Sequence, residues 1–170
     1  LVIKVTEQME AYDLNKVTHL IQDFVCDELS NWYIRRNRRR FWGSKLDNSK
    51  KAVYKTTYDV LVGICKLIAP ICPFISEEIY TNLPTHLDSI MLDRYPEVEE
   101  QFIFPESEEK IDDIITMIKD IRSYKVENNL APNAQIKLTL IPNENIDLTS
   151  YLTYLKRFTF ASEINIKEQG

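Results

Sequence analysis

The feature that most constrains this chain is an apolar stripe that repeats at three- and four-residue spacing across residues 14–40. Residues at this spacing lie on one face of an α-helix. Asp13 is a suitable N-cap, because its carboxylate can accept hydrogen bonds from the first backbone amides. The stripe predicts one long helix over 14–40 that buries a single face, formed by Val17, Leu20, Ile21, Phe24, Val25, Leu29, Trp32 and Tyr33.

Further amphipathic segments predict three more helices, at about 50–69, 74–83 and 107–128. Prolines separate these segments, and proline ends helices because it lacks the amide proton and restricts the residue before it. Between the third and fourth helices, DSIML at 88–92 is expected to be extended, and 93–106 is expected to form an acidic connector. Residues 1–130 are therefore predicted to form an antiparallel helical bundle.

The pattern changes character after the fourth helix. QIKLTLI at 135–141 alternates apolar and polar residues, as a half-buried strand does. A short helix capped by Asp147 is expected to run to about Phe158, and a second strand is expected at 164–166. The sequence thus predicts a mainly α fold, with a small α/β appendage over residues 131–170.

Charge is sharply segregated along the chain, although the formal net charge is only −5. Residues 35–45 hold six basic side chains and no acid, whereas residues 97–113 hold eight acids and one lysine. Phosphate contacts act over a Debye length of about 8–10 Å, so the local distribution matters more than the sum. The basic stretch is a candidate surface for a polyanion, and the acidic stretch is expected to be solvated.

The basic stretch lies in NWYIRRNRRRFW, residues 31–42, which combines five arginines with four aromatic rings. At 100° per residue, Arg36 and Arg39 continue the apolar stripe, so that face is expected to turn basic at the end of the helix. Arginine offers a planar fork of donors that fits a phosphate, and neighbouring rings can stack on unpaired bases. The pattern favours contact with single-stranded RNA, with core packing as the alternative role of Trp32 and Tyr33.

Motifs of catalysis are absent from the sequence, including phosphate-binding, dinucleotide-binding, serine-hydrolase and zinc-protease patterns. His19 and His86 are the two histidines. Glu77 and Glu78 are adjacent on a predicted helix, so these two carboxylates point to different faces of that helix. The three cysteines lack CxxC spacing and indicate neither a disulfide framework nor a metal site. The chain by itself is expected to be non-catalytic, without a metal or cofactor, and to belong to a reducing cytoplasm.

Two segments carry a resemblance to a known family. DELSNWYIRRNRRRFW at 27–42 and YKTTYDVLVGICKLIAPICPFISEEIYTNL at 54–83 closely resemble the anticodon-binding helical domain of class I aminoacyl-tRNA synthetases. Within that group, the chain is most similar to the isoleucyl enzymes over about residues 5–95. The later segments SIMLDRYPE and IRSYKVENNLAPNAQIKLTLI are more similar to the valyl enzymes.

The resemblance implies a piece of a ligase that joins an amino acid to tRNA with ATP and Mg²⁺. Catalysis would take place in a domain outside these 170 residues, and no catalytic residue or metal ligand is expected here. The implied partners are tRNA and that catalytic domain, with a monomeric state and no membrane association. Contact with the anticodon stem and loop is assigned to Asn31, Trp32, Tyr33, Arg35, Arg36, Arg38, Arg39, Arg40, Phe41 and Trp42, with Arg122 and Lys125 adding to the same field.

Three alternatives to an isoleucyl RNA-binding domain stay open. The chain could be the same domain of a valyl-tRNA synthetase. It could instead be a non-enzymatic helical domain whose basic patch docks an acidic protein, or an architectural spacer. Salt-dependent binding of an anticodon stem–loop, lost when the arginines are removed, would separate RNA binding from the last two.

Overall fold

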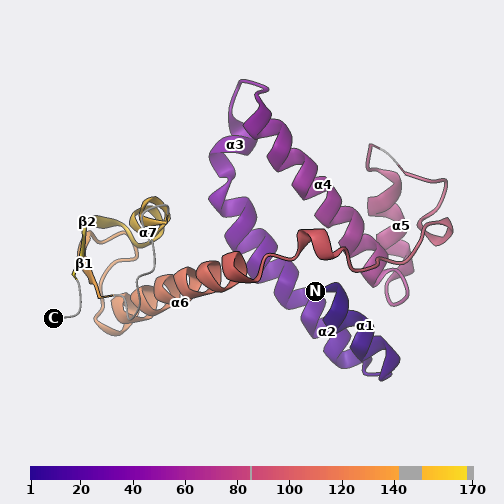
Figure 1. Ribbon diagram of the computed structural model, residues 1–170, viewed down its shortest axis with the longest axis horizontal. Helices are drawn as coiled ribbons and strands as arrows, with labels where there is room; N and C mark the ends of the chain where they lie inside the picture. The colour runs from indigo at the N-terminus through magenta and orange to yellow at the C-terminus, as the bar shows by residue number, and fades with distance from the viewer. Residues whose placement is uncertain (85, 142–150, 168–170) are drawn as a thin grey trace. The chain divides into compact units, whose positions relative to one another are not determined.

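A computed structural model describes residues 1–84, 86–141 and 151–167 of the chain (Figure 1). It divides into two compact units, Leu1–Glu100 and Gln101–Gly170, which are described one after the other. Helices make up the first unit, and helices with a pair of strands make up the second. The predicted mainly α fold with a small C-terminal α/β part is confirmed. Within the described ranges, no helix combines the length and apolarity that a bilayer crossing needs.

The first unit is built on a helical hairpin (Figure 1). One arm consists of α2 (Leu14–Asp23), the π-helix η1 (Phe24–Ile34) and α3 (Arg38–Trp42). The other arm is α4 (Asn48–Ile68), which returns antiparallel to the first. The long helix predicted over 14–40 is therefore confirmed, apart from a turn at Asn37 that separates α3 from the rest.

Shorter helices pack against the arms at one end of the hairpin. α1 (Val2–Glu10), which the sequence pattern did not predict, packs on α2, and α5 (Pro73–Thr81) packs on α4. The segment expected to be extended at 88–92 instead contains a 3₁₀ turn, η2 (Ile90–Leu92), which contacts α5. The hydroxyl of Ser89 caps this turn by accepting a hydrogen bond from the Met91 amide at 3.2 Å.

Two carboxylates fix where the arms begin. Asp13 Oδ1 accepts a hydrogen bond from the Lys16 amide at 3.1 Å, which confirms the predicted N-cap of α2. Asp47 Oδ1 accepts one from the Lys50 amide at 2.7 Å and caps α4 in the same way. Each side chain satisfies a first-turn amide that has no partner within its helix.

The π-helix changes which residues face the core. Its hydrogen bonds reach one residue further than those of an α-helix, so the 100° wheel loses register across η1. Leu29 is buried, whereas Phe24 and Trp32 are half-buried. Of the two arginines expected to continue the stripe, Arg36 is half-buried, and Arg39, which follows the turn at Asn37, is exposed.

The core of the first unit lies at the end of the hairpin opposite α3. One cluster joins α1, α2 and the end of α4, and a second joins the end of α4 to α5 and η2. The buried members are Val5, Val17, Ile21 and Leu67 in the first cluster, and Cys65, Ala69, Tyr80 and Ile90 in the second. Toward the α3 end, Leu29 and Val53 are buried but belong to neither cluster, so other contacts must also hold that end.

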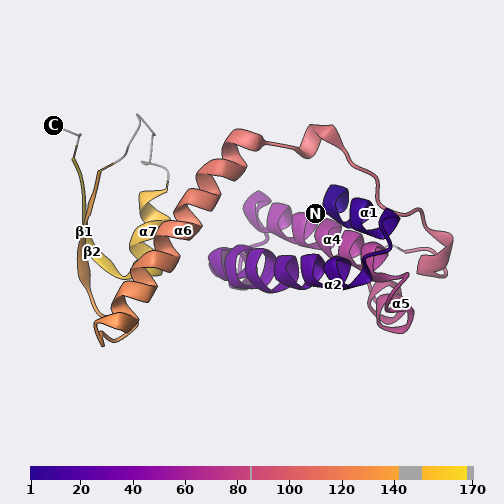
Figure 2. The same ribbon diagram turned by 90° about the horizontal axis from the view of Figure 1, so that it is seen from below.

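The second unit contains α6 (Pro105–Glu127), α7 (Leu152–Thr159) and two parallel strands, β1 (Ile136–Leu140) and β2 (Ala161–Ile166). A 3₁₀ turn, η3 (Glu100–Phe102), spans the boundary between the units. Helix α7 lies between α6 and the strands (Figure 2).

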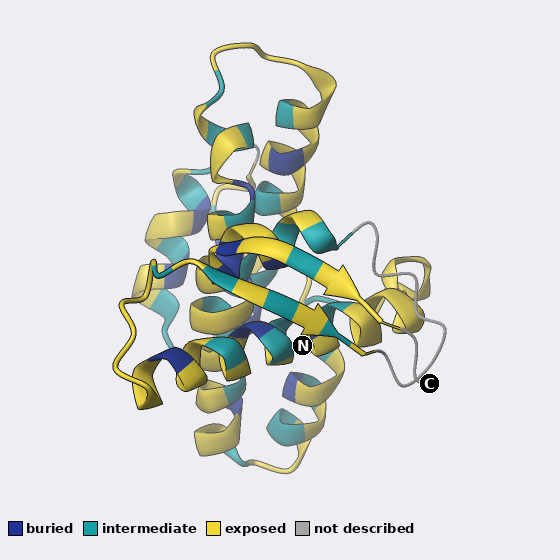
Figure 3. Ribbon diagram, turned by 90° about the vertical axis from the view of Figure 1, so that its left-hand side faces the viewer, coloured by how far each residue is buried: buried dark blue, intermediate teal, exposed yellow. Residues whose placement is uncertain are grey.

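The strands and the fourth helix confirm the expected pattern of this region. Burial alternates along β1 as QIKLTLI predicted (Figure 3). The expected cap at Asp147 lies outside the described residues. The two compact units divide after Glu100, and α6 packs against α7 of its own unit.

Candidate nucleic-acid interface

The arginine-rich segment lies at the end of the hairpin where the chain turns from α3 into α4 (Figure 1). We call residues 35–54 the hairpin tip; it comprises α3, the connection to α4 and the first turns of α4. The tip carries eight basic side chains and one acid, Asp47. Its side chains divide into those that hold the tip together and those that project from it.

The helical break at Asn37 is completed by that residue's own side chain, which is 4% exposed. Its Nδ2 donates to the Tyr33 carbonyl at 2.9 Å, and its Oδ1 accepts from Arg40 Nη1 at 2.9 Å. The Asn37 carbonyl accepts from the amides of Arg40 at 2.8 Å and Phe41 at 3.2 Å, which starts α3. The buried side-chain amide of Asn37, which can both donate and accept, therefore replaces the regular backbone hydrogen bonds of the helix at this point.

Arg40 joins this break to α4. Besides its bond to Asn37, its Nε donates to Ser49 Oγ at 2.9 Å and its Nη2 donates to the Ser49 carbonyl at 2.6 Å. Three of the five guanidinium N–H donors are thus used within the tip. Arg40, which was predicted to contact tRNA, is half-buried and also has this role inside the protein.

Two further side chains of α4 reach back to the connection. Lys50 Nζ donates to the Gly43 carbonyl at 2.7 Å, and Tyr54 Oη donates to the Phe41 carbonyl at 3.3 Å. The Phe41 ring packs edge-on against Tyr54, with centroids 5.5 Å apart. Phe41 is half-buried, so it belongs to the tip's own packing more than to its outer surface.

Arg35, Arg38 and Arg39 project from the tip and are exposed. Among the residues that the structure describes, no carboxylate forms an ion pair with them. The guanidinium of Arg38 lies over the Trp42 ring, 5.2 Å from its centroid, and Trp42 is 68% exposed. This end of the hairpin therefore offers uncompensated positive charge next to a flat, open aromatic surface.

The remaining predicted residues of the segment lie on η1 and its end. Asn31 is exposed, while Trp32, Tyr33 and Arg36 are half-buried. The Arg36 guanidinium lies 5.8 Å from the Trp32 ring centroid. Trp32 and Tyr33 therefore combine partial packing with partial exposure, which is consistent with the packing alternative that the sequence left open.

The two predicted residues of α6 belong to the other compact unit. Arg122 is exposed, and its guanidinium lies 6.0 Å from the Phe158 ring centroid. Lys125 is 2% exposed, and its Nζ donates to the carbonyls of Pro132, Ala134 and Thr159 at 3.3, 2.6 and 2.7 Å. Burial lowers the pKa of Lys125. Lys125 is therefore a structural residue, and its assignment to the RNA surface is corrected.

Sequence reasoning missed two residues that the structure adds to the tip's surface. Lys51 is exposed, like Lys45 of the predicted basic stretch, and Tyr54 is about half exposed. The available signal was Asp47, since a helix capped there places Lys50 and Lys51 in its first turn beside α3. The basic surface thus includes the start of α4 as well as α3.

Glu77 accepts hydrogen bonds that join two elements of the first unit. Its Oε2 accepts from Ser89 Oγ at 3.1 Å and from the Ile90 amide at 2.8 Å, which holds η2 against α5. Beside it, the Tyr80 hydroxyl donates to Asp93 Oδ2 at 2.7 Å. Hydrogen bonds from Lys66 and Tyr80 lower the pKa of Asp93.

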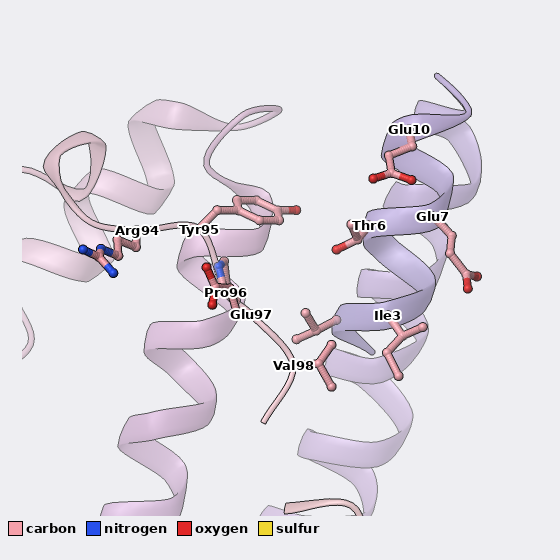
Figure 4. Close-up of a pocket in the computed structure, with 10 residues that line it drawn as sticks. Ile3, Thr6, Glu7, Glu10, Arg94, Tyr95, Pro96, Glu97 and Val98 are labelled. Carbon is pink, nitrogen blue, oxygen red and sulfur yellow. The ribbon is translucent and has the colours of Figure 1, made fainter. Parts of the chain in front are cut away.

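A pocket of about 730 Å³ lies elsewhere in the first unit, between α1 and the segment 94–98. Thr6 and Glu10 face Tyr95 across it (Figure 4). Its charged lining is mostly acidic and includes none of the residues predicted to bind RNA. The pocket is therefore separate from the hairpin tip.

Comparison with known proteins gives a consistent result. A family model described as the anticodon-binding domain of tRNA ligase matches residues 1–140. An isoleucine–tRNA ligase 2 of Bacillus thuringiensis is 38% identical over 96% of this chain and 15% of its own length. Isoleucine–tRNA ligases of Chlamydia caviae and Clostridium tetani are 35% and 36% identical, over 96% and 99% of this chain and 16% of their own lengths. The chain spans about a sixth of the length of these relatives.

Proposed function

This chain belongs to the family of anticodon-binding domains of tRNA ligases, and we propose that its hairpin tip binds the anticodon stem and loop of a tRNA. The observation that carries the proposal is the set of exposed arginines, Arg35, Arg38 and Arg39, beside the open ring of Trp42. RNA loops present phosphates and splayed bases together, so a surface with both guanidinium groups and an aromatic face fits them.

The chemistry divides between two kinds of contact. Arg35, Arg39, Lys45 and Lys51 provide cations for phosphates, which position the RNA and make its affinity depend on salt. Trp42, with Arg38 over its ring, provides a platform on which an unpaired base stacks.

We further propose that the parent protein is an isoleucine–tRNA ligase. The relatives described above carry that name, which favours isoleucine over the valine alternative. This domain would orient the tRNA in the cytoplasm, as part of a monomer whose aminoacylation takes place in a catalytic domain outside the 170 residues. ATP and Mg²⁺ would act in that domain. Among the described residues of this chain, no cluster of His, Cys, Asp and Glu fits a metal ion.

A salt titration of RNA binding tests the proposal. The 170-residue chain is titrated with the anticodon stem–loop of an isoleucine-accepting tRNA at several salt concentrations. Arg39→Gln should weaken binding and lower the slope of log affinity against log salt by about 0.7–0.9, the value for one phosphate contact. Lys4→Gln, which removes an exposed cation from α1, is the matched control and should change little.

The triple variant with Arg35, Arg38 and Arg39 changed to Gln should lose most of the salt-dependent binding. Equal binding by the parent and the triple variant would contradict the proposal. Stronger binding of polyglutamate than of RNA would instead favour the acidic-protein alternative.

A further inference from the structure

Arg40 differs from its neighbours in what its guanidinium contacts. Arg35, Arg38 and Arg39 are exposed, whereas Arg40 donates to Asn37 in one arm of the hairpin and to Ser49 in the other. The two acceptors at Ser49 are its hydroxyl and its carbonyl, so the planar fork is fixed in direction as well as position.

We propose that Arg40 is a positioning residue for RNA binding. It ties the break at Asn37 to the first turn of α4 and so sets the direction in which Arg38, Arg39 and Trp42 project. This role rests on the proposed function, because its consequence is read out through RNA affinity.

The tip needs such a device because little else fixes α3. That helix has five residues, too few to be stable through its own hydrogen bonds. The two apolar clusters of the unit lie at the other end of the hairpin, and within the tip Val53 is the one buried apolar side chain. Besides Val53 and the packing of Phe41 on Tyr54, α3 and its connection are held by hydrogen bonds from Arg40, Lys50 and Tyr54 to Ser49, Gly43 and Phe41.

The consequence for binding follows from where Arg40 lies. Arg38 and Trp42 are two positions before and after it, so release of Arg40 would free the pair that stacks at 5.2 Å. A mobile tip must lose conformational entropy when RNA orders it, and this loss weakens binding without removing any contact. The number of phosphate contacts, and hence the salt slope, stays the same.

Charge-preserving variants separate positioning from direct contact. Arg40→Lys keeps the positive charge but replaces a fork with a single ammonium, and Ser49→Ala removes one acceptor without touching any charge. Arg39→Lys is the matched control, because it makes the same replacement at an exposed neighbour. For each variant, RNA affinity is measured at several salt concentrations, and amide hydrogen exchange over residues 41–50 is measured without RNA.

We expect Arg40→Lys to weaken RNA binding by roughly tenfold, with an unchanged salt slope, as the loss of one charge-assisted hydrogen bond implies. Amides of 41–50 should exchange faster in Arg40→Lys and in Ser49→Ala. Arg39→Lys should leave exchange unchanged and reduce affinity by less than about threefold.

Two results would overturn the proposal. In the first, Arg40→Lys has the same RNA affinity and the same amide exchange in the tip as the parent. In the second, Arg40→Gln has the same exchange as the parent but lowers the salt slope by about 0.7–0.9, which would make Arg40 a direct phosphate contact. If Arg40→Lys does not fold, the RNA affinity and the amide exchange of Ser49→Ala test the proposal in its place. Absence of RNA binding by the parent would defeat the proposed function, and the exchange data would still show whether Arg40 fixes the tip.

Discussion

The Lys125 ammonium donates to the Thr159 carbonyl at 2.7 Å and so joins the end of α6 to the end of α7. Its two other hydrogen bonds reach Ala134 and Pro132, just before β1. An ammonium has three protons, so all of its donors are used. One buried side chain therefore connects three segments of the second unit.

Replacing this lysine should destabilise the second unit. Lys125→Met keeps most of the apolar stem but leaves three carbonyls without their donor, and we expect a loss of about 3 kcal/mol in the free energy of unfolding. Chemical denaturation, monitored by amide hydrogen exchange over residues 101–141, measures this loss. Lys119→Met, at an exposed position of the same helix, is the control. A loss no larger than that of the control would show that the carbonyls find water instead.

Asp93 should make the first unit sensitive to acid. A hydrogen bond from Lys66, and to a smaller extent one from Tyr80, lowers the pKa of Asp93 in the folded state. The Lys66 Nζ lies 2.8 Å from Asp93 Oδ2. A carboxylate with a lowered folded pKa stabilises the protein above its unfolded pKa, about 3.9, and loses that contribution as the pH falls through the folded pKa.

The variant Asp93→Asn tests this pH dependence through denaturant unfolding. It should be less stable than the parent near neutral pH, and the gap should narrow below about pH 4. Asp59→Asn, which removes a more exposed partner of Lys55, should change stability less at every pH. A gap that stays constant down to about pH 2 would contradict the assignment.

The register of η1 predicts an order of stability losses. Leu29 is buried, and Leu29→Ala should cost about 2–5 kcal/mol. Phe24 is half-buried, so Phe24→Ala should cost less than the roughly 3–5 kcal/mol of a fully buried phenylalanine. Urea denaturation at fixed pH measures both, with Cys26→Ala as an exposed control on the same helix. The reverse order would favour a regular α-helix through this segment.

Hydrophobic periodicity predicted the hairpin arm of α2 and η1, and also α4, α5, α6 and β1, because each of these elements buries one face against a neighbour. It could not predict the π-helix, since a helical wheel assumes the very spacing that η1 abandons. α1 was missed, although its Val5 is fully buried.

The composition of the candidate site was predictable, but the division of labour within it was not. Arg39 and Arg40 are identical in type and adjacent, and only the position of Ser49 after the turn tells them apart. Lys125 was assigned to the RNA surface with Arg122 because both lie near the end of the predicted fourth helix. Its partners are backbone carbonyls, which no residue type reveals.

Trp42 provides the last prediction, because its ring is exposed and Arg38 lies over it. Trp42→Ala should weaken binding of the anticodon stem–loop by about 1–3 kcal/mol, the value for one stacked base, and leave the salt slope unchanged. Trp42→Phe should retain part of the affinity because a smaller ring still stacks.

Leu46 supplies a matched control for Trp42. It lies on the connection that follows Trp42 and is equally exposed, at 68%, but it has no ring on which a base can stack. Leu46→Ala should therefore bind as the parent does. In a Trp32→Phe background, the fluorescence of Trp42 should be quenched as the RNA is added, in parallel with binding. If Trp42→Ala and Leu46→Ala weaken binding equally, or if the fluorescence does not respond, then the open ring is not a base platform and the tip binds RNA through its cations alone.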